Sequence, residues 1–214
     1  MPASRIHLVR HGEVHNPEGV LYGRLPQFAL SARGHEMAAA AAHELQESGA
    51  KIAKIFVSPL LRTLESAQPI QDAYKLDVTV DDRLIEPYNI FEGKKVSASS
   101  VLLRPNLWLH LRNPNEPSWG EPYRAIVERM MSALNEIADD SAGIEVAVVS
   151  HQLPIWMVHQ HLAGHKLAHN PNKRRCALSS ITTIERDEDG SWREVSYTEV
   201  STRHASAAED RGAV

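Results

Sequence analysis

The chain lacks the features that mark secreted and membrane proteins. Its 214 residues include one cysteine, Cys176, so no intrachain disulfide can form, which fits a reducing compartment. Its most conspicuous apolar run, residues 37–42, is far shorter than the roughly 20 residues that span a bilayer. The N-terminal residues, MPASRIHLVRHG, contain no apolar stretch of signal-peptide length. These absences predict a cytoplasmic protein with no membrane contact.

Excess positive charge and metal-ligand motifs are missing as well. The formal net charge of −4 at pH 7 argues against general affinity for nucleic acid. There are 12 histidines, yet no HExxH or Cys/His ligand set appears. His159 and His161 lie two apart on a predicted helix and point to different faces. We therefore expect no metal and no other cofactor. The 43% of hydrophobic residues suffices for an ordinary globular core.

Strand and helix patterns alternate along most of the chain. The helix signals include Ser31 as an N-cap, Ser58-Pro59 as a cap followed by a first-turn proline, and Pro154 as a helix start. A helix over 97–112 is interrupted by Pro105. Strands are predicted over 5–9, 52–57, 76–80, 144–149, 177–186 and 191–200, and further helices over 31–49, 58–74, 126–137 and 154–164.

This alternation predicts an α/β fold with a mostly parallel central sheet, helices on both faces and an antiparallel edge hairpin, a three-layer sandwich. We expect one domain over residues 1–202 and a disordered tail over 203–214, which is rich in Ala, Ser and charge. Ligands of such sheets bind beyond the carboxyl ends of the strands. Three polar stretches, 10–11, 58–62 and 150–151, directly follow predicted strands. They should therefore converge at one edge.

The converging residue types suit phosphate chemistry. Arg10 and Arg62 can hold a tetrahedral oxyanion through paired N–H donors. A neutral imidazole is a nucleophile near pH 7 and needs no metal. An alkoxide leaving group needs a proton, which a carboxylic acid with a raised pKa could supply. On composition alone the acids that could do so are Glu13, Glu65, Glu86 and Glu121, and near Glu86 also Asp81, Asp82 and Glu92.

Four stretches resemble the landmarks of one family, in the family's order. Leu8-Val9-Arg10-His11-Gly12-Glu13 resembles the signature of the histidine phosphatase superfamily, also called the phosphoglycerate mutase-like family. Ser58-Pro59-Leu60-Leu61-Arg62-Thr63 resembles its Ser-Pro-x-x-Arg-[Ala/Thr] element. Leu84-Ile85-Glu86 resembles its acidic element, and Val149-Ser150-His151 its second-histidine element. The similarity covers roughly residues 5–186, and four ordered motifs are far more specific than one RHG tripeptide.

The resemblance implies roles for individual residues. His11 would be the phosphorylated nucleophile, and Glu86 the general acid that later activates water. One departure is Gln152, because the family often has glycine after the second histidine. The remaining implied roles are Arg10, Arg62 and His151 around the phosphoryl group, and Asn16 and Arg24 as further phosphate contacts.

Each of these residues also has an ordinary structural interpretation. Arg10 and His11 could be solvated side chains at a strand end, His151 a structural cap, and Arg62 a partner of Glu65 or Ser66 on its own helix. Other residues have two open interpretations as well. They are Glu121 (helix start or support of the site), Lys173-Arg174-Arg175 (solvated turn or contact to a phosphate end), Cys176 (core or catalyst), and Trp108 and Trp119 (packing or pocket mouth).

Three functions are consistent with the sequence. The first is a phosphatase of a small phosphomonoester through a phosphohistidine on His11. The second is a cofactor-dependent phosphoglycerate mutase, but family mutases typically carry Glu-Arg-His-Tyr-Gly where this chain has Glu86-Pro87-Tyr88-Asn89-Ile90. The third is a non-catalytic phospho-ligand-binding protein, which would not need a nucleophile. The region 88–124 is expected to set the specificity, whereas the natural substrate and the oligomeric state are not readable from the sequence.

Overall fold

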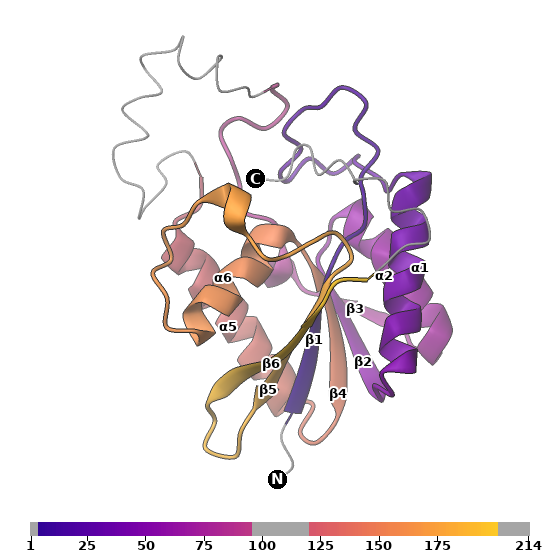
Figure 1. Cartoon of the computed structure of the whole chain (residues 1–214), viewed down its shortest axis with the longest axis vertical. Helices are drawn as coiled ribbons and strands as arrows, with labels where there is room; N and C mark the ends of the chain where they lie inside the picture. The colour runs from indigo at the N-terminus through magenta and orange to yellow at the C-terminus, as the bar shows by residue number, and fades with distance from the viewer. Residues whose placement is uncertain (1–3, 96–119, 201–214) are drawn as a thin grey trace.

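The computed structural model describes residues 4–95 and 120–200, and strands and helices alternate along them (Figure 1). The strands are β1 (Ser4–Arg10), β2 (Ile52–Val57), β3 (Val78–Val80), β4 (Glu145–Ser150), β5 (Ile181–Arg186) and β6 (Trp192–Thr198). The helices are α1 (Ala32–Glu47), α2 (Leu61–Tyr74), α5 (Tyr123–Asp139) and α6 (Gln152–Leu162), with short 3₁₀ turns η1 (Asp82–Leu84) and η3 (Pro171–Lys173).

All six strands join in one sheet, in the order β3-β2-β4-β1-β5-β6. The first four in this order pair in parallel, whereas β5 runs antiparallel to β1 and β6 antiparallel to β5. The predicted α/β sheet with an antiparallel edge hairpin is therefore confirmed. Parallel pairing places the carboxyl ends of β1, β2 and β4 at one edge of the sheet, where each strand leads into a loop.

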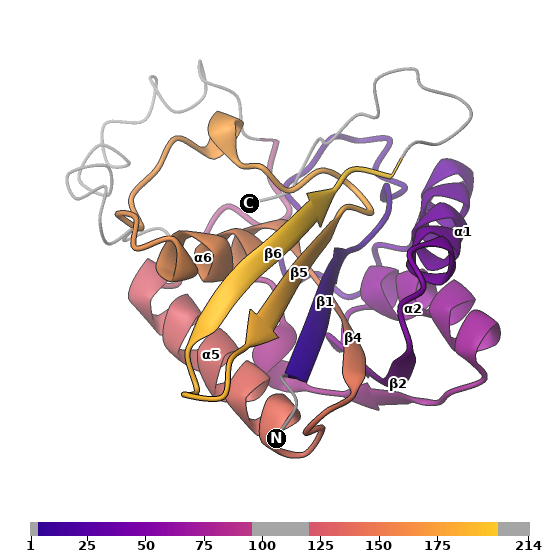
Figure 2. The same ribbon diagram turned by 60° about the horizontal axis from the view of Figure 1, so that its bottom comes forward.

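The helices cover the sheet on both faces (Figures 1 and 2). One core layer joins Ile6 and Leu8 of β1 to the apolar faces of α5 and α6. The other joins Val9, from the opposite side of the same strand, to α1 and α2. Successive side chains of a strand point to opposite faces, so the apolar residues of β1 and β4 fill both layers. This burial makes the centre of the sheet a rigid platform for the loops at its edge.

Two predicted helix starts are wrong, and one is right. Ser31 caps α1 by accepting a hydrogen bond from the Gly34 N–H, as predicted. Ser58 does not cap α2, which begins at Leu61, because the Ser58 N–H still bonds the Val149 carbonyl and the chain stays extended to Leu60. Pro154 does not open α6, which begins two residues earlier at Gln152. A proline in the first turn costs no intrahelical bond, so it does not prevent the earlier start.

The strand at β5 is shorter than predicted, because residues 177–180 form a turn. Ser179 has a positive φ of 56° and its N–H bonds the His11 carbonyl. The Arg10 N–H bonds the Ser180 carbonyl. Cys176 is a buried residue of the preceding loop. The first strand residue is Ile181, so this turn lies against the end of β1.

Other boundaries shift by a few residues, and some predictions cannot be compared. The third strand covers 78–80 rather than 76–80, and the fourth ends at Ser150 rather than at 149. The predicted helix over 97–112, both tryptophans in 108–119 and the tail over 203–214 lie outside the described residues. Within residues 4–95 and 120–200, no helix is both long and apolar enough to cross a membrane.

Candidate active site

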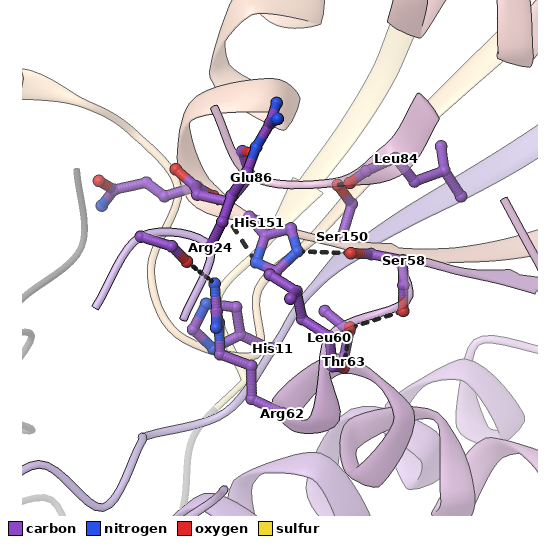
Figure 3. Close-up of polar contacts among 12 residues, drawn as sticks. His11, Arg24, Ser58, Leu60, Arg62, Thr63, Leu84, Glu86, Ser150 and His151 are labelled. Carbon is purple, nitrogen blue, oxygen red and sulfur yellow. Dashed lines mark hydrogen bonds and ion pairs between the residues drawn. The ribbon is translucent and has the colours of Figure 1, made fainter. Parts of the chain in front are cut away.

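The polar residues after β1, β2 and β4 meet at the carboxyl edge of the sheet. Arg10 pairs in register with Ser150, and Val57 pairs with Val149, so the three strands end at one level. The side chains of His11 and His151 lie beside one another, with their ring centroids 5.3 Å apart (Figure 3). The expected convergence of these stretches is therefore present in the structure.

His11 is buried and oriented by its own backbone. Its Nδ1 lies 2.8 Å from the Gly12 carbonyl oxygen. Because a carbonyl only accepts, Nδ1 carries the proton and Nε2 keeps its lone pair. Burial lowers the pKa of His11 well below its usual range, and the nearby charges of Arg62 and Arg10 lower it further. His11 is thus a neutral imidazole whose Nε2 is available as a nucleophile.

Close backbone packing holds the His11 main chain in place. The Gly12 N–H donates to Ser66 Oγ of α2 at 3.0 Å. On its other side, a Cβ at Gly12 would lie 2.4 Å from the Gly34 carbonyl oxygen of α1, a distance that real Cβ atoms do not tolerate. Glycine is required here because two backbones approach closely. The residue after His11 is thus held between α1 and α2.

Arg62 presents a buried guanidinium to the site. It lies in the first turn of α2, donates from Nη2 to the Gly23 carbonyl at 2.6 Å, and stacks 4.8 Å from the ring centre of Tyr22. Its Nε and Nη1 have no hydrogen-bond partner among the residues that the structure describes. Buried donors of this kind are normally satisfied. Two donors on a fixed planar fork are therefore suited to an oxyanion.

Arg10 is fully buried at the end of β1. Its Nη1 donates to the Cys176 carbonyl at 2.6 Å, which ties the loop before β5 to the site. Arg10 and Arg62 both lower the pKa of His11, so both charges act on this imidazole. The ordinary interpretations of these two arginines, a solvated side chain and a partner of Glu65 or Ser66, do not describe their buried side chains.

His151 lies between Ser58 and Glu86. Its Nε2 lies 2.7 Å from Ser58 Oγ, and its Nδ1 lies 3.6 Å from Glu86 Oε2. Burial lowers the pKa of His151 well below its usual range, and the charge of Arg62 adds to this effect. His151 is therefore also neutral. Sequence reasoning used Ser58 as a helix cap and missed it as the partner of His151, which is 93 residues away.

Glu86 is the acidic group of the site. It is buried at 3% exposure, and the chain leading to it is tied to the sheet by a hydrogen bond from Ser150 Oγ to the Leu84 carbonyl at 2.7 Å. Burial raises its pKa to about 7, although the charges of Arg62, Arg174, Arg10 and Arg129 oppose this shift. A carboxyl with this pKa is largely protonated just below neutrality, so it can donate a proton.

The other acidic groups are engaged elsewhere. Glu13 accepts from Ser31 Oγ at 2.6 Å, and Glu65 accepts from the Leu30 N–H at 2.6 Å. Asp81 pairs with Arg83. The remaining acids are Asp82, which is exposed, and Glu92, which accepts from the N–H groups of Arg24 and Asn89. Among the described carboxyl groups, Glu86 is the one that faces the histidines.

Arg24 and Glu121 support the Glu86 segment. Arg24 donates from Nε to the Glu86 carbonyl at 2.6 Å and from Nη2 to Glu121 Oε2 at 3.0 Å. Arg129 binds the same carboxylate from its other side, at 2.7 and 3.1 Å. Arg24 thus lies at the site, where it holds the main chain of Glu86. Asn16 shapes its own loop, because its side-chain amide exchanges hydrogen bonds with the Val20 backbone at 2.8 and 3.2 Å.

The basic run 173–175 divides into three environments. Lys173 is exposed, and Arg175 pairs with Glu194 of β6. Arg174 turns inward and donates to Gln152 Oε1 at 3.2 Å, next to His151. The interpretation as a solvated turn is therefore right for Lys173 and wrong for Arg174. No local pattern distinguishes the three residues, because only the folded loop decides which one points inward.

The described residues contain no group of three or more His, Cys, Asp or Glu side chains that could hold a metal ion. The site consists of buried arginines, two neutral histidines and one carboxyl with a raised pKa. Such a set can bind a phosphoryl group, attack it from nitrogen and protonate a departing oxygen.

Comparisons with known proteins agree with this architecture. A family model described as the histidine phosphatase superfamily (branch 1) matches residues 6–200. The uncharacterized protein Rv0525 of Mycobacterium tuberculosis is 48% identical over 187 residues, which cover 87% of this chain and 92% of that protein. Phosphoserine phosphatase 1 of Hydrogenobacter thermophilus is 31% identical over 161 residues, 73% of this chain and 75% of that protein.

A solved structure, that of YhfR from Bacillus stearothermophilus, superposes with a TM-score of 0.76. It is 24% identical and the match covers 89% of this chain and 95% of that one, a likeness that concerns the fold. Fold and sequence together define a phosphatase-like α/β protein. The chain belongs to the histidine phosphatase superfamily, as its four motifs predicted.

Proposed function

We propose that this protein hydrolyses a small phosphomonoester through a phosphohistidine on His11. The observation that carries the proposal is the pairing of opposite pKa shifts in one buried site. His11 is neutral with its Nε2 available, and Glu86 is protonated near neutrality. Nucleophilic attack needs a neutral imidazole, and expulsion of an alkoxide needs a protonated acid.

The reaction has two steps. In the first, His11 Nε2 attacks phosphorus, the bond from phosphorus to the ester oxygen breaks, and Glu86 transfers its proton to that oxygen. In the second, the Glu86 carboxylate takes a proton from water, whose oxygen attacks phosphorus and breaks the P–N bond. Inorganic phosphate and neutral His11 result. Arg10, Arg62 and His151 surround the phosphoryl oxygens and stabilise their charge in both steps.

The names of relatives support the class of reaction. Phosphoserine phosphatase 1 of Hydrogenobacter thermophilus carries the name of a small-ester phosphatase and matches most of this chain. A mutase would return the phosphoryl group to its product instead of releasing it. The residues after Glu86, which depart from the mutase pattern, favour transfer to water. Release of inorganic phosphate without 2,3-bisphosphoglycerate-dependent isomerisation is therefore expected.

The test is to trap the intermediate. Rapid acid-free quenching of turnover with labelled nitrophenyl phosphate should yield base-stable, acid-labile label on His11. His11→Ala should lose the label and lower kcat at least about a thousandfold with unchanged circular dichroism. The control is His43→Ala, an exposed histidine of α1, which should behave as wild type. Activity of His11→Ala within tenfold of wild type would refute the proposal.

A further inference from the structure

Ser58 is a buried residue of the site that the reaction above does not use. It directly follows β2 and is fully buried, and its N–H bonds the Val149 carbonyl of the neighbouring strand β4 at 3.0 Å. Its own carbonyl oxygen lies 2.8 Å from Thr63 Oγ1 of α2. Because the backbone of Ser58 is held on both sides, its side chain has a fixed position. From there, Ser58 Oγ lies 2.7 Å from Nε2 of His151, the residue that follows β4.

The two ring nitrogens of His151 have different surroundings. Nε2 meets Ser58, whereas Nδ1 lies 3.6 Å from Glu86 Oε2, which is too far for a hydrogen bond. Figure 3 shows Ser58 and Glu86 on opposite sides of the ring. Nδ1 is buried and has no hydrogen-bond partner among the residues that the structure describes. Buried polar atoms are normally paired, so this nitrogen suits a partner that arrives with the substrate.

The hydroxyl proton of Ser58 decides which nitrogen of His151 carries hydrogen. A neutral imidazole has one N–H and one lone pair, whereas a hydroxyl can donate or accept. If Ser58 donates to Nε2, the hydroxyl proton is paired and the ring hydrogen lies on Nδ1. If Nε2 donates instead, the buried hydroxyl proton has no acceptor in the described part of the chain, and Nδ1 turns a lone pair toward the phosphoryl oxygens. An unpaired buried donor costs free energy, so the first arrangement is favoured.

The groups around His151 keep its ring neutral, which is why the tautomer matters. Burial lowers the pKa of His151, and four nearby groups lower it further: Arg62, His11, Arg129 and Arg10. Glu86, which faces the ring, has a pKa raised to about 7 and carries little charge below neutrality to oppose them. A neutral ring can donate to an oxyanion from one nitrogen only. The wrong tautomer would therefore repel the phosphoryl group that the right one binds.

We propose that Ser58 is a positioning residue that holds His151 in its Nδ1–H tautomer, so that the neutral ring donates a hydrogen bond to a phosphoryl oxygen. Ser58 acts through His151 and does not itself contact the substrate. The inference rests on the proposed phosphatase function for its effect on turnover. The tautomer, by contrast, is a property of the resting protein and can be measured without any substrate.

The first experiment determines the tautomer by NMR. In protein labelled with nitrogen-15 at histidine, a ring nitrogen that carries hydrogen and one that carries a lone pair resonate far apart. The signals of His151 are those that disappear in His151→Gln. At pH 7 the wild-type ring should carry its hydrogen on Nδ1, and Ser58→Ala should give a mixture of both tautomers. Hydrogen on Nε2 in the wild type, or an unchanged tautomer in Ser58→Ala, overturns the proposal.

The second experiment measures turnover of nitrophenyl phosphate, whose leaving group departs without a proton. Ser58→Ala should lower kcat/KM about fivefold to a hundredfold at pH 8, the range for a lost buried hydrogen bond. This deficit relative to wild type should shrink as the pH falls to 5, because an imidazolium carries hydrogen on both nitrogens and no longer needs Ser58. Ionisation of the ester cancels in the ratio of the two proteins. A deficit of equal size at every pH would leave Ser58 a purely structural role and overturn the proposal.

The matched control is Ser141→Ala, which removes another buried hydroxyl, just before β4 begins and thus at the end of that strand opposite to His151. It should keep the wild-type kcat/KM at each pH and the wild-type signals of His151. A Ser58→Ala protein that does not fold leaves the test decisive, because the wild-type tautomer is measured without it. Absence of turnover in a folded wild-type protein overturns the phosphatase function, whereas the tautomer of that protein still decides the arrangement proposed for Ser58.

Discussion

Burial moves the two central groups of the site in opposite directions. It penalises the charged form of each, so the pKa of His11 falls and that of Glu86 rises to about 7. The arginines add to the shift of His11 and oppose that of Glu86. Both groups are therefore neutral over the same range of pH, just below 7. One physical cause thus gives the neutral imidazole and the protonated carboxyl that the proposed reaction needs within one buried site.

Removing the acid should show its role through the leaving group. Glu86→Gln keeps the shape but cannot donate a proton, so an alkyl phosphate should slow by about a hundredfold to ten-thousandfold. Nitrophenyl phosphate should slow much less in the first step, because nitrophenolate leaves without a proton. Phosphohistidine should then accumulate, since activation of water is also lost. Stopped-flow release of nitrophenolate and quench-flow trapping measure these quantities.

The same variant tests the pH dependence. The acid form is needed, and the pKa of Glu86 is raised to about 7, so kcat/KM for the alkyl ester should fall as pH rises through 7. Glu86→Gln should lack this fall. Glu92→Gln, a change at a neighbouring carboxyl, should keep it. Equal slowing of both esters, with an unchanged pH profile, would leave Glu86 only a role in shaping the site.

At the scale of the elements, the site depends on how closely α1 approaches the chain that leaves β1 at His11. Gly34 lies in the first turn of α1, and a Cβ there would lie 2.0 Å from the Glu13 carbonyl oxygen. The same turn meets Gly12. The Ser31 N–H also bonds the Glu13 carbonyl. Close main-chain contacts with α1, together with the hydrogen bond from the Gly12 N–H to Ser66 Oγ, therefore set the position of His11.

Gly34→Ala should consequently harm both stability and turnover. The methyl group gains roughly 1 kcal/mol of helix propensity. It must nevertheless displace a backbone, and overpacking costs about 1–3 kcal/mol. We expect a net loss of stability in urea unfolding and at least a tenfold lower kcat with nitrophenyl phosphate. The control is Glu36→Ala, a change at an exposed position two residues further along α1, which should be neutral or slightly stabilising. A Gly34→Ala protein as stable and active as wild type would contradict this account.

At the scale of the whole molecule, one edge of the sheet brings together positively charged side chains from distant parts of the chain. Arg10 comes from β1, Arg62 from α2 and Arg174 from the connection before β5, and all are drawn to one edge although the net charge is −4. Bringing these guanidinium groups together lowers the free energy of unfolding because like charges repel. A bound anion offsets this loss. A bound anion should therefore stabilise the native state.

Inorganic phosphate should raise the melting temperature of the wild-type protein, and it should do so equally in the presence of a chelator. At about 100 times its dissociation constant the gain is about 2.7 kcal/mol, or several degrees for a chain of this size. Arg62→Gln should lose the shift, and Arg62→Lys should keep part of it. The control is Arg124→Gln, an exposed arginine of α5, which should keep all of it. Loss of the wild-type shift on chelation, restored by a divalent ion, would point to a metal-dependent site.

Local patterns in the sequence were enough to predict the alternating elements, their approximate bounds and the strand ends at which the residues of the candidate site lie. Strand periodicity, the Ser31 cap and the residues that follow β1, β2 and β4 are short-range features, and parallel strands must share a carboxyl edge. The family motifs added the correct superfamily. The helix starts at 58 and 154 were wrong, because hydrogen bonds to the sheet and tolerance of a first-turn proline decided them.

Only the tertiary structure decided which of many similar side chains take part. Ser58 meets His151 across 93 residues, and Arg24 meets Glu121 across 97. The sequence predicted that the stretches 58–62 and 150–151 converge, but not which of their side chains meet, because a cap signal and a site contact need the same serine. The pKa of Glu86 likewise depends on its burial and its distant arginines. The inward orientation of Arg174 between two basic neighbours also depends on the tertiary structure, because only long-range packing determines which of the three side chains is buried.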